Sequence, residues 1–466
     1  MENKERYKRL LIILSSVVII ALQAVIFMYV WYGVFDDEGA NYYNRGNYVL
    51  ISIYTVLLYL FYKIYGGFKI GHNKLLPMLY SQTLSVICVN TITYFLLSLI
   101  GRWKFMTNVE PILWMTLADF VVVVIWVVFT RWLYVKVFPP RKVLVIYGQY
   151  SPDNLIKKLE KRKDEHLIDK IVSIDNDLDF IKKEMLNYRN VILTDIPAEL
   201  RNEILKFCFA QNIRCYSVPK ISDIMIKSAT NIHLFDTSLL LFRNFSLTAE
   251  QQFLKRIFDI FASLVAIILA SPLMLIISLA IFLYDRGPVI FTQDRLTRDG
   301  KTFKIYKFRS MRVSEDEEYC LTRKEDERIT PIGRIIRAVH FDELPQLFNI
   351  LKGEMSVVGP RPECPILAEE YSENVPEFGF RLKVKAGLTG YAQVYGKYNT
   401  TPYDKLKLDL TYIQNYSFLL DLKIIVLTLK ILFEKENTEG IDNDQTTALV
   451  DNLLSDSNNV EDDDTK

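Results

Sequence analysis

The sequence lacks the features that several protein classes require. Its formal net charge is only +1, with 56 basic and 55 acidic residues among 466, which argues against a nucleic-acid binder. Five cysteines form no C-x-x-C pair and four histidines are scattered, so neither a zinc site nor a disulfide framework is indicated. Apolar residues, in contrast, reach 50%, as expected for membrane segments joined to soluble parts.

Four apolar runs near the start of the chain are long enough to span a membrane. The first exceeds the apolar core of a signal peptide, so we predict a retained helix. Basic residues follow the second and fourth runs, and positive loops mark the cytoplasmic side, which predicts four spans with both ends inside. Asp119 lies in the fourth run near its end, and we interpret it as structural. The predicted spans are Leu10–Val34, Tyr48–Tyr65, Leu75–Ile100 and Ile112–Val135, within a membrane region of residues 1–140.

Residues 141–235 change to alternating strand and helix patterns, which predict a small parallel, Rossmann-like α/β domain. Its first strand ends at Gly148, the one glycine of that turn, whereas dinucleotide binding needs three for backbone approach to a pyrophosphate. We therefore predict a scaffold or regulatory domain without a bound nucleotide. The predicted strands are 142–147, 168–174, 190–194 and 213–218, and the predicted helices are 153–163, 178–187 and 197–211.

A fifth apolar run, Ile257–Leu283, follows a predicted linker at residues 236–254. Both its flanks are basic, and Ser271 and Pro272 lie at its centre. Because proline removes a backbone donor and both flanks favour the cytoplasm, we predict a re-entrant helix-break-helix. The alternative, a fifth span, would place the following residues outside, away from nucleotide-sugar pools.

Two adjacent carboxylates, Asp342 and Glu343, precede an apolar run that starts Leu-Pro. Asp is a favoured N-cap, proline is tolerated in a first turn, and Gly353 suits a helix end. We therefore predict a helix of about ten residues with the pair at its N-terminus. Such a terminus suits phosphate and keeps a carboxylate ionised. Paired carboxylates also suit Mg²⁺, although an Asp cap followed by Glu is usually only structural.

Basic residues surround this pair in the sequence. Arg337 precedes it and Arg361 follows it in Gly-Pro-Arg-Pro, while Lys307 and Arg309 flank Phe308 in a predicted strand. Alternation along that strand would aim Lys307 and Arg309 at one face, although any single cation can be a membrane anchor. Other predictions are a solvated acidic loop at 314–327, an interfacial amphipathic helix at 418–433 and a disordered acidic tail at 438–466.

Residues 255–437 resemble the bacterial sugar transferase family, the polyprenyl-phosphate glycosyl-1-phosphate transferases. The resemblance lies in segments that occur in order along the chain: Lys255-Arg-Ile-Phe-Asp259, Gly287-Pro-Val289, Gln293-Asp-Arg295, Lys307-Phe-Arg-Ser-Met311, Asp342-Glu-Leu-Pro-Gln346, Lys352-Gly-Glu-Met-Ser356, Gly359-Pro-Arg-Pro362 and Gly387-Leu-Thr-Gly390. It implies an α+β catalytic domain with a membrane-dipping hairpin, after the N-terminal helical membrane bundle and the Rossmann-like domain.

The resemblance also implies an activity. A UDP-sugar and undecaprenyl phosphate would give undecaprenyl-diphosphate sugar and UMP at the cytoplasmic face of the cell membrane, starting a surface polysaccharide. Asp342 matches the family's nucleophile, Glu343 a residue that assists at Mg²⁺, and Arg337 and Arg361 match positions implicated in phosphate binding. We further predict that the helix N-terminus, Arg337 and Arg361 keep Asp342 ionised.

Two other functions were weighed. A membrane-bound nucleotide-sugar dehydratase needs a Tyr-x-x-x-Lys pair, which Tyr403 and Lys407 match, but no glycine-rich NAD loop stands upstream. A non-catalytic scaffold of a polysaccharide export complex would not need the carboxylates and arginines. The apolar membrane part is compatible with a homo-oligomer, and no residue set identifies the sugar.

Overall fold

The computed structural model describes residues 7–35, 44–71, 74–100, 109–148, 150–160, 162–242, 247–312, 328–396 and 400–431. The predicted acidic loop at 314–327 and the predicted tail at 438–466 lie outside these residues. Contacts within the chain divide it into two compact units, Met1–Val218 and Pro219–Lys466.

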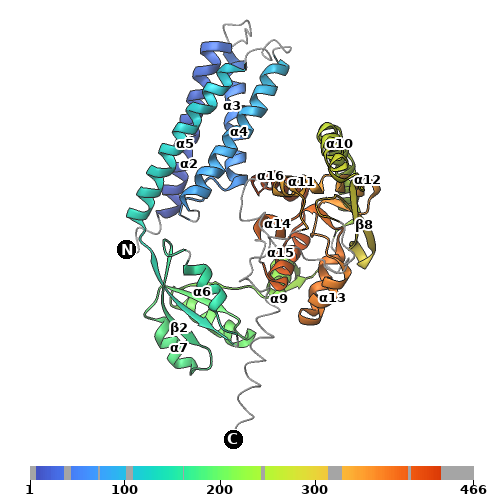
Figure 1. Cartoon of the computed structure of the whole chain (residues 1–466). Helices are drawn as coiled ribbons and strands as arrows, with labels where there is room; N and C mark the ends of the chain where they lie inside the picture. The colour runs from blue at the N-terminus through green and yellow to red at the C-terminus, as the bar shows by residue number, and fades with distance from the viewer. Residues whose placement is uncertain are drawn as a thin grey trace. The chain divides into compact units, whose positions relative to one another are not determined.

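Four long helices form the first part of the first unit and lie side by side (Figure 1). Each is long and apolar enough to cross a membrane, as the apolar runs predicted. Large apolar side chains cover the outside of the bundle, which suits a lipid environment. The helices are α2 (Lys8–Val30, extended by the π-helical turn η1, Trp31–Phe35), α3 (Asn44–Tyr65), α4 (Leu75–Ile100) and α5 (Glu110–Val137).

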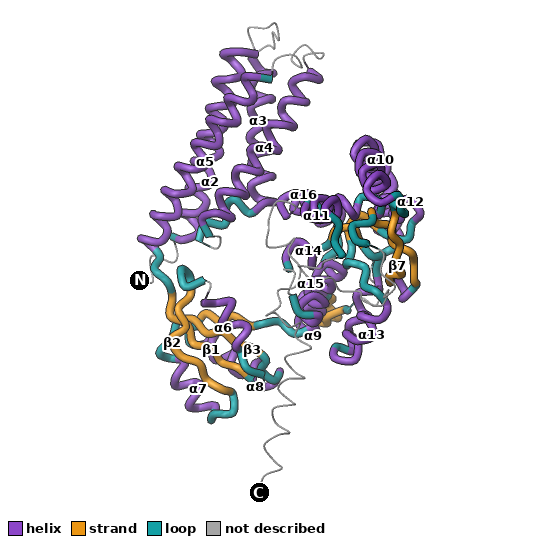
Figure 2. Tube along the Cα trace, viewed as in Figure 1, coloured by secondary structure: helices purple, strands orange, loops and turns teal. Residues whose placement is uncertain are grey.

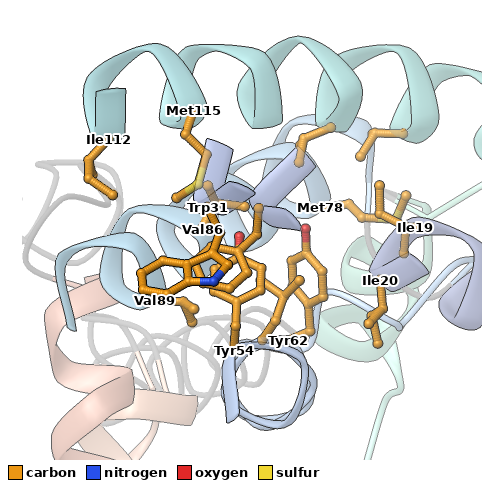
Figure 3. Close-up of a cluster of buried hydrophobic side chains, with 14 of the residues drawn as sticks. Ile19, Ile20, Trp31, Tyr54, Tyr62, Met78, Val86, Val89, Ile112 and Met115 are labelled. Atoms are coloured by element: carbon orange, nitrogen blue, oxygen red, sulfur yellow. The ribbon is translucent and has the colours of Figure 1, made fainter. Parts of the chain in front are cut away.

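The inside of this bundle combines aromatic and polar side chains. Trp31, Tyr54 and Tyr62 pack in the cluster drawn in Figure 3. The hydroxyl of Tyr62 donates to Gln23 at 2.8 Å. Asp119 is fully buried rather than extended toward the membrane surface, and Asn90 donates to its carboxylate at 3.1 Å. Hydrogen bonds between helices therefore hold the bundle from within.

A four-stranded parallel sheet forms the rest of the first unit, in the order β2-β1-β3-β4 (Figure 2). Apolar clusters cover both faces, with α7 and α8 on one face and α6 on the other. The predicted alternation of strand and helix is confirmed. The elements are β1 (Arg141–Tyr147), α6 (Asp153–Glu160), β2 (His166–Ser173), α7 (Leu178–Met185), β3 (Asn190–Thr194), α8 (Ala198–Ala210) and β4 (Arg214–Ser217).

Gly148, after β1, serves close packing within this domain. A Cβ at this position would lie 2.0 Å from the carbonyl oxygen of Asp195, so only glycine fits without a backbone shift. Glycine is needed at position 148 because the loop after β3 approaches its Cα closely.

The second unit begins with a helix and a β-hairpin. The sequence had predicted the end of the Rossmann-like domain (residues 141–235) and the start of a linker (residues 236–254) in this part of the chain. Helix α9 (Ile221–Ser228) is followed by the antiparallel strands β5 (Thr230–Leu234) and β6 (Thr237–Leu241). Ile221 and Ile224 of α9 pack in the same apolar cluster as residues of the C-terminal helices. The next helix, α10, starts at Ala249, inside the predicted linker of residues 236–254.

Helix α10 (Ala249–Asp285) corrects part of the prediction for the fifth apolar run. It stays helical through Ser271 and Pro272, so the predicted division into two helices is wrong. Pro272 has no N–H for the carbonyl of Ile268, and the hydroxyl of Ser271 donates to that carbonyl at 2.9 Å instead. The side-chain bond satisfies the group that proline leaves free, so the helix continues. By length and composition α10 too is apolar enough to cross a membrane.

The rest of the second unit packs small strand pairs among short helices. Strands β7 and β8 form an antiparallel pair, and β9 lies parallel to β10. The predicted interfacial helix at 418–433 is present as α16, but its Asp421 is buried in an ion pair with Lys255 of α10, 2.6 Å apart. The elements are β7 (Ile290–Leu296), η3 (Arg298–Gly300), β8 (Thr302–Phe308), α11 (Pro331–Ala338), η4 (Phe341–Glu343), α12 (Gln346–Lys352), β9 (Ser356–Val358), α13 (Pro365–Asn374), η5 (Pro376–Lys383), β10 (Gly387–Thr389), α14 (Tyr391–Tyr395), α15 (Pro402–Gln414) and α16 (Phe418–Ile431).

Candidate active site

The carboxylate pair lies in a short 3₁₀ turn rather than at the N-terminus of a ten-residue helix. Asp342 and Glu343 belong to η4, and the seven-residue α12 starts only at Gln346, with Pro345 in its N-cap position. The predicted role of Asp342 as N-cap is therefore wrong. Pro345 has no N–H to continue the hydrogen-bond ladder, which explains two short helices in place of one. Gly353 ends α12 with φ 91°, in the left-handed region, as predicted.

Glu343 is the charged centre of the site. Its side chain is nearly buried, and one oxygen, Oε1, accepts hydrogen bonds from Lys307 and Arg361, each at 2.8 Å. Burial opposes ionisation of Glu343, but Arg361 and Lys307 outweigh it and hold its pKa well below the usual range. Glu343 is therefore an anion at any physiological pH.

Asp342 behaves differently from its neighbour. Burial raises its pKa, the charges of Lys307 and Arg337 lower it, and the adjacent Glu343 raises it again. The net direction is upward, so burial outweighs the cations that were expected to lower the pKa of Asp342. Arg361 forms its ion pair with Glu343 and interacts with Asp342 only through its charge, and η4 places Asp342 outside the first turn of α12. The pKa values of the two neighbouring carboxyl groups are thus shifted in opposite directions, upward for Asp342 and downward for Glu343.

A small cavity opens beside Glu343. The described residues that line it are Arg295, Ile305, Lys307, Glu343, Gln346, Arg361, Pro362 and Gly387. Lys307 and Arg361 were predicted from the sequence, and the structure brings them together. Arg337 and Asp342 lie close enough to interact electrostatically but do not line the cavity. Arg309 does not line the cavity, and its guanidinium lies against Gly287, 2.4 Å from where a Cβ would stand there.

A buried ionic network holds the segment that carries Arg361. Arg381, only 2% exposed, donates to the carbonyl oxygen of Arg361 at 3.0 Å and to the carboxylate of Glu363 at 3.2 Å. It also donates to Asp409 at 2.9 Å, and Lys405 forms a second ion pair with Glu363. The carbonyl of Arg361 and the side chain of Glu363 are therefore anchored, which limits where the guanidinium of Arg361 can lie.

Sequence reasoning did not assign several of these residues to the site. Arg295 and Gln346 lie in segments that carry the family resemblance, and Glu363 directly follows Gly-Pro-Arg-Pro. Their positions in the sequence could therefore have pointed to the site. Arg381 and Asp409 had no such signal, because the chain brings them together over 28 positions. Tertiary structure alone identifies this part of the network.

The carboxylate pair fits a magnesium ion by its chemistry. Both side chains offer hard oxygen donors, and Mg²⁺ is often bound through one or two carboxylates together with substrate phosphates and water. Across the described ranges, His, Cys, Asp and Glu side chains form no group of three or more able to hold a metal. A magnesium site here would thus consist of Asp342, Glu343 and oxygen atoms of the substrate.

Residues 250–435 match the family described as bacterial sugar transferase. A protein from Caulobacter vibrioides named UDP-glucose:undecaprenyl-phosphate glucose-1-phosphate transferase is 40% identical over 189 residues, which cover 39% of this chain and 71% of that protein. The chain belongs to the bacterial sugar transferase family. The Asp342 and Glu343 pair, its cations and the cavity all lie within the part that matches the family.

Two further relatives show how far the family likeness extends. A Klebsiella pneumoniae protein with the same name as the Caulobacter one is 45% identical over 181 residues, covering 38% of this chain but only 39% of its own length. A Streptococcus agalactiae protein named galactosyl transferase CpsE is 30% identical over 350 residues, covering 65% of this chain and 74% of its own. That alignment is longer than the second unit, so it includes part of the first.

Proposed function

We propose that this protein transfers a sugar-1-phosphate from a UDP-sugar to undecaprenyl phosphate. The products are undecaprenyl-diphosphate sugar and UMP, and the reaction would start the assembly of a surface polysaccharide. The observation that carries the proposal is the pairing of Glu343 with Lys307 and Arg361 beside the half-buried Asp342. The names of the Caulobacter and Klebsiella relatives describe this reaction for glucose, whereas the sugar used here stays open.

Binding of the donor follows from the charges of the cavity. Arg295, Lys307 and Arg361 converge on it, with Glu343 as the opposing anion. A diphosphate would offer oxygens that accept hydrogen bonds from the same ammonium and guanidinium groups. Because these donors are held before the substrate arrives, they stabilise charge on the phosphoryl oxygens without reorganisation. The cavity is thus suited to the diphosphate part of the donor.

Asp342 is the nucleophile in this proposal. One of its carboxylate oxygens attacks the phosphorus that bears the sugar, and the bond from that phosphorus to the UMP oxygen breaks as UMP leaves. An oxygen of undecaprenyl phosphate then attacks the same phosphorus, and Asp342 leaves as a carboxylate. Burial raises the pKa of Asp342, which makes its ionised form more basic than a solvated carboxylate and more reactive toward phosphorus.

Glu343 and the cations position the reacting groups. Asp342 and Glu343 would hold Mg²⁺, which when bound supplies neutralisation of the diphosphate charge. Glu343 stays ionised because of Arg361 and Lys307, so it does not compete with Asp342 for a proton. Arg337 supplies a positive charge on the side of Asp342. Each of these groups favours the approach of an anionic nucleophile to an anionic substrate.

We infer that α10 bends at Pro272 while staying helical, so that it enters the membrane from the cytoplasmic side and returns. Near its start, Arg256 donates to the carbonyl of Ile350 at 2.6 Å; near its end, Ile281 packs with Phe308 and Ile336. All three partners belong to the second unit. A helix that crossed the bilayer would place these two contacts about 30 Å apart on opposite faces, which supports re-entry. The lipid phosphate would then reach the site from the membrane surface.

A turnover assay tests the proposed function. Full-length protein in detergent or nanodiscs receives Mg²⁺, undecaprenyl phosphate and one of four donors: UDP-glucose, UDP-galactose or their N-acetyl counterparts. Release of UMP that depends on both the lipid and Asp342 is the expected result. If no donor yields UMP above the level of an Asp342→Asn variant, the proposal is wrong and a scaffold role gains support.

A further inference from the structure

The cavity contains one polar side chain that the proposed reaction does not use. Gln346 is only 2% exposed and lines the cavity together with Lys307 and Arg361. Within the described parts of the chain, its side-chain amide has no hydrogen-bonding partner. Its amide atoms are not fully enclosed, so they face open space, and a group that enters the cavity can accept from or donate to them.

The position of Gln346 is firmly held. It is the first residue of α12, and Asn349 of that helix donates to the carbonyl of Lys304 at 2.8 Å and accepts from the amide of Tyr306 at 3.0 Å. These bonds attach α12 to β8, the strand that carries Lys307. At the other end of α12, Arg256 donates to the carbonyl of Leu351 at 2.7 Å. The backbone that carries Gln346 is therefore held in place relative to β8, the strand that carries Lys307.

The charges of the cavity identify the kind of group that Gln346 would meet. The cationic side chains of Arg295, Lys307 and Arg361 line the same space, so the part of a substrate that enters it is anionic. An amide offers two N–H donors, and a phosphoryl oxygen accepts them. A sugar hydroxyl is neutral, so it would interact with these three cations more weakly than an anionic phosphoryl oxygen does.

We propose that Gln346 is a further substrate-binding residue, whose amide donates a hydrogen bond to a non-bridging oxygen of the phosphoryl group that is transferred. This inference rests on the proposed function. The phosphoryl group stays at the site in both steps, first in the donor and then on Asp342, so the same hydrogen bond assists both. A neutral donor adds to the binding by Lys307 and Arg361 without adding charge.

The first test removes the donor and keeps the shape. In the Gln346→Met variant of the full-length protein, exchange of labelled UMP into UDP-sugar without lipid acceptor should fall about 10- to 100-fold, as expected for loss of a hydrogen bond to a charged group. The fall should be equal for every UDP-sugar that the wild type accepts, because all share the phosphoryl group. Gln414→Met, on α15 where the side chain accepts from Ser228, is the matched control and should exchange normally.

The second test uses charge. The Gln346→Glu variant keeps the size of the side chain but places a carboxylate beside the phosphoryl oxygens, so its exchange rate should fall further than that of Gln346→Met. Protonation of that carboxylate restores a neutral donor, so the ratio of its rate to the wild-type rate should rise as the pH is lowered. A residue with only a structural role would show no such recovery.

The outcomes separate this inference from the proposed function. An inactive wild type with every donor overturns the proposed function. An active wild type with unchanged exchange in Gln346→Met overturns only the role of Gln346. Losses that differ between sugars would mean that the amide contacts the sugar, and a lowered unfolding temperature with no pH-dependent recovery in Gln346→Glu would mean a packing role. Either result also overturns the inference.

Discussion

The ammonium of Lys307 and the carboxylate of Glu343 lie 2.8 Å apart, joining β8 to the 3₁₀ turn η4 across 36 positions of sequence. The same Glu343 oxygen accepts from Arg361, so two cations are held in place by one buried anion. This arrangement keeps both phosphate-binding groups at the cavity before a substrate enters. It also leaves Asp342 without either cation as a hydrogen-bonding partner among the described residues, with burial as the main influence on its pKa.

Replacing Asp342 by Asn should remove the nucleophile while leaving the fold intact, since an amide fits the same space. We expect a loss of UMP release of about 10⁴-fold or more, the scale seen when a nucleophile is removed. With labelled donor and no lipid acceptor, quenched wild-type protein should carry the sugar phosphate on Asp342, detected by mass spectrometry. Asp299→Asn, in the exposed turn η3, is the control. Full activity in Asp342→Asn, or a wild type that never traps label, would exclude the covalent route.

The Lys307→Met variant should change how activity depends on pH. Asp342 must be ionised to attack, so activity is lost as the pH falls through its raised pKa. Lys307 lowers that pKa, and its removal should therefore move the acid limb of the UMP exchange profile to higher pH. Glu343 keeps Arg361 and remains ionised over this range. Lys301→Met, at an exposed position, should leave the profile unchanged, and an identical profile for Lys307→Met would contradict the assignment of Asp342.

The buried network around Arg381 should control activity separately from stability. Arg381→Met leaves Asp409 buried without its cation, and breaking a buried ion pair costs about 3–5 kcal/mol, measured by denaturant unfolding. Replacing both partners, Arg381→Met with Asp409→Leu, should recover most of that loss because no unpaired charge remains. Activity should stay low in the double variant, because the hydrogen bond to the carbonyl of Arg361 is still missing. Recovery of activity together with stability would assign Arg381 to packing alone.

The course of α10 can be tested by labelling from one side of the membrane. Single cysteines at Phe253 and Arg286, both exposed, should react with an impermeant maleimide only when the cytoplasmic face is accessible. Labelling from opposite faces would establish a fifth span.

Ser271→Ala should weaken the helix near Pro272, because the carbonyl of Ile268 then loses its donor. A matched Ser278→Ala change, at a hydroxyl that bonds its own helix without a nearby proline, should have the smaller effect.

Elements whose causes are local could be predicted from the sequence. Apolar runs of membrane length became α2 to α5, alternating patterns became the parallel sheet with its three helices, and Gly353 ended α12. These features depend on residues within about one helical turn or one strand of each other. The family resemblance also associated Arg361 with Asp342 and Glu343, and strand alternation added Lys307 together with Arg309, of which only Lys307 lines the cavity.

The pairing of charged side chains, in contrast, depends on the folded chain. The sequence put Asp342 first, with a helix terminus and two arginines to hold its charge, yet the fold gives Arg361 and Lys307 to Glu343 and leaves Asp342 with a raised pKa. Arg381 and Asp409 became partners in the same way. A pKa depends on burial and on charges brought from distant parts of the chain, and no local pattern records either.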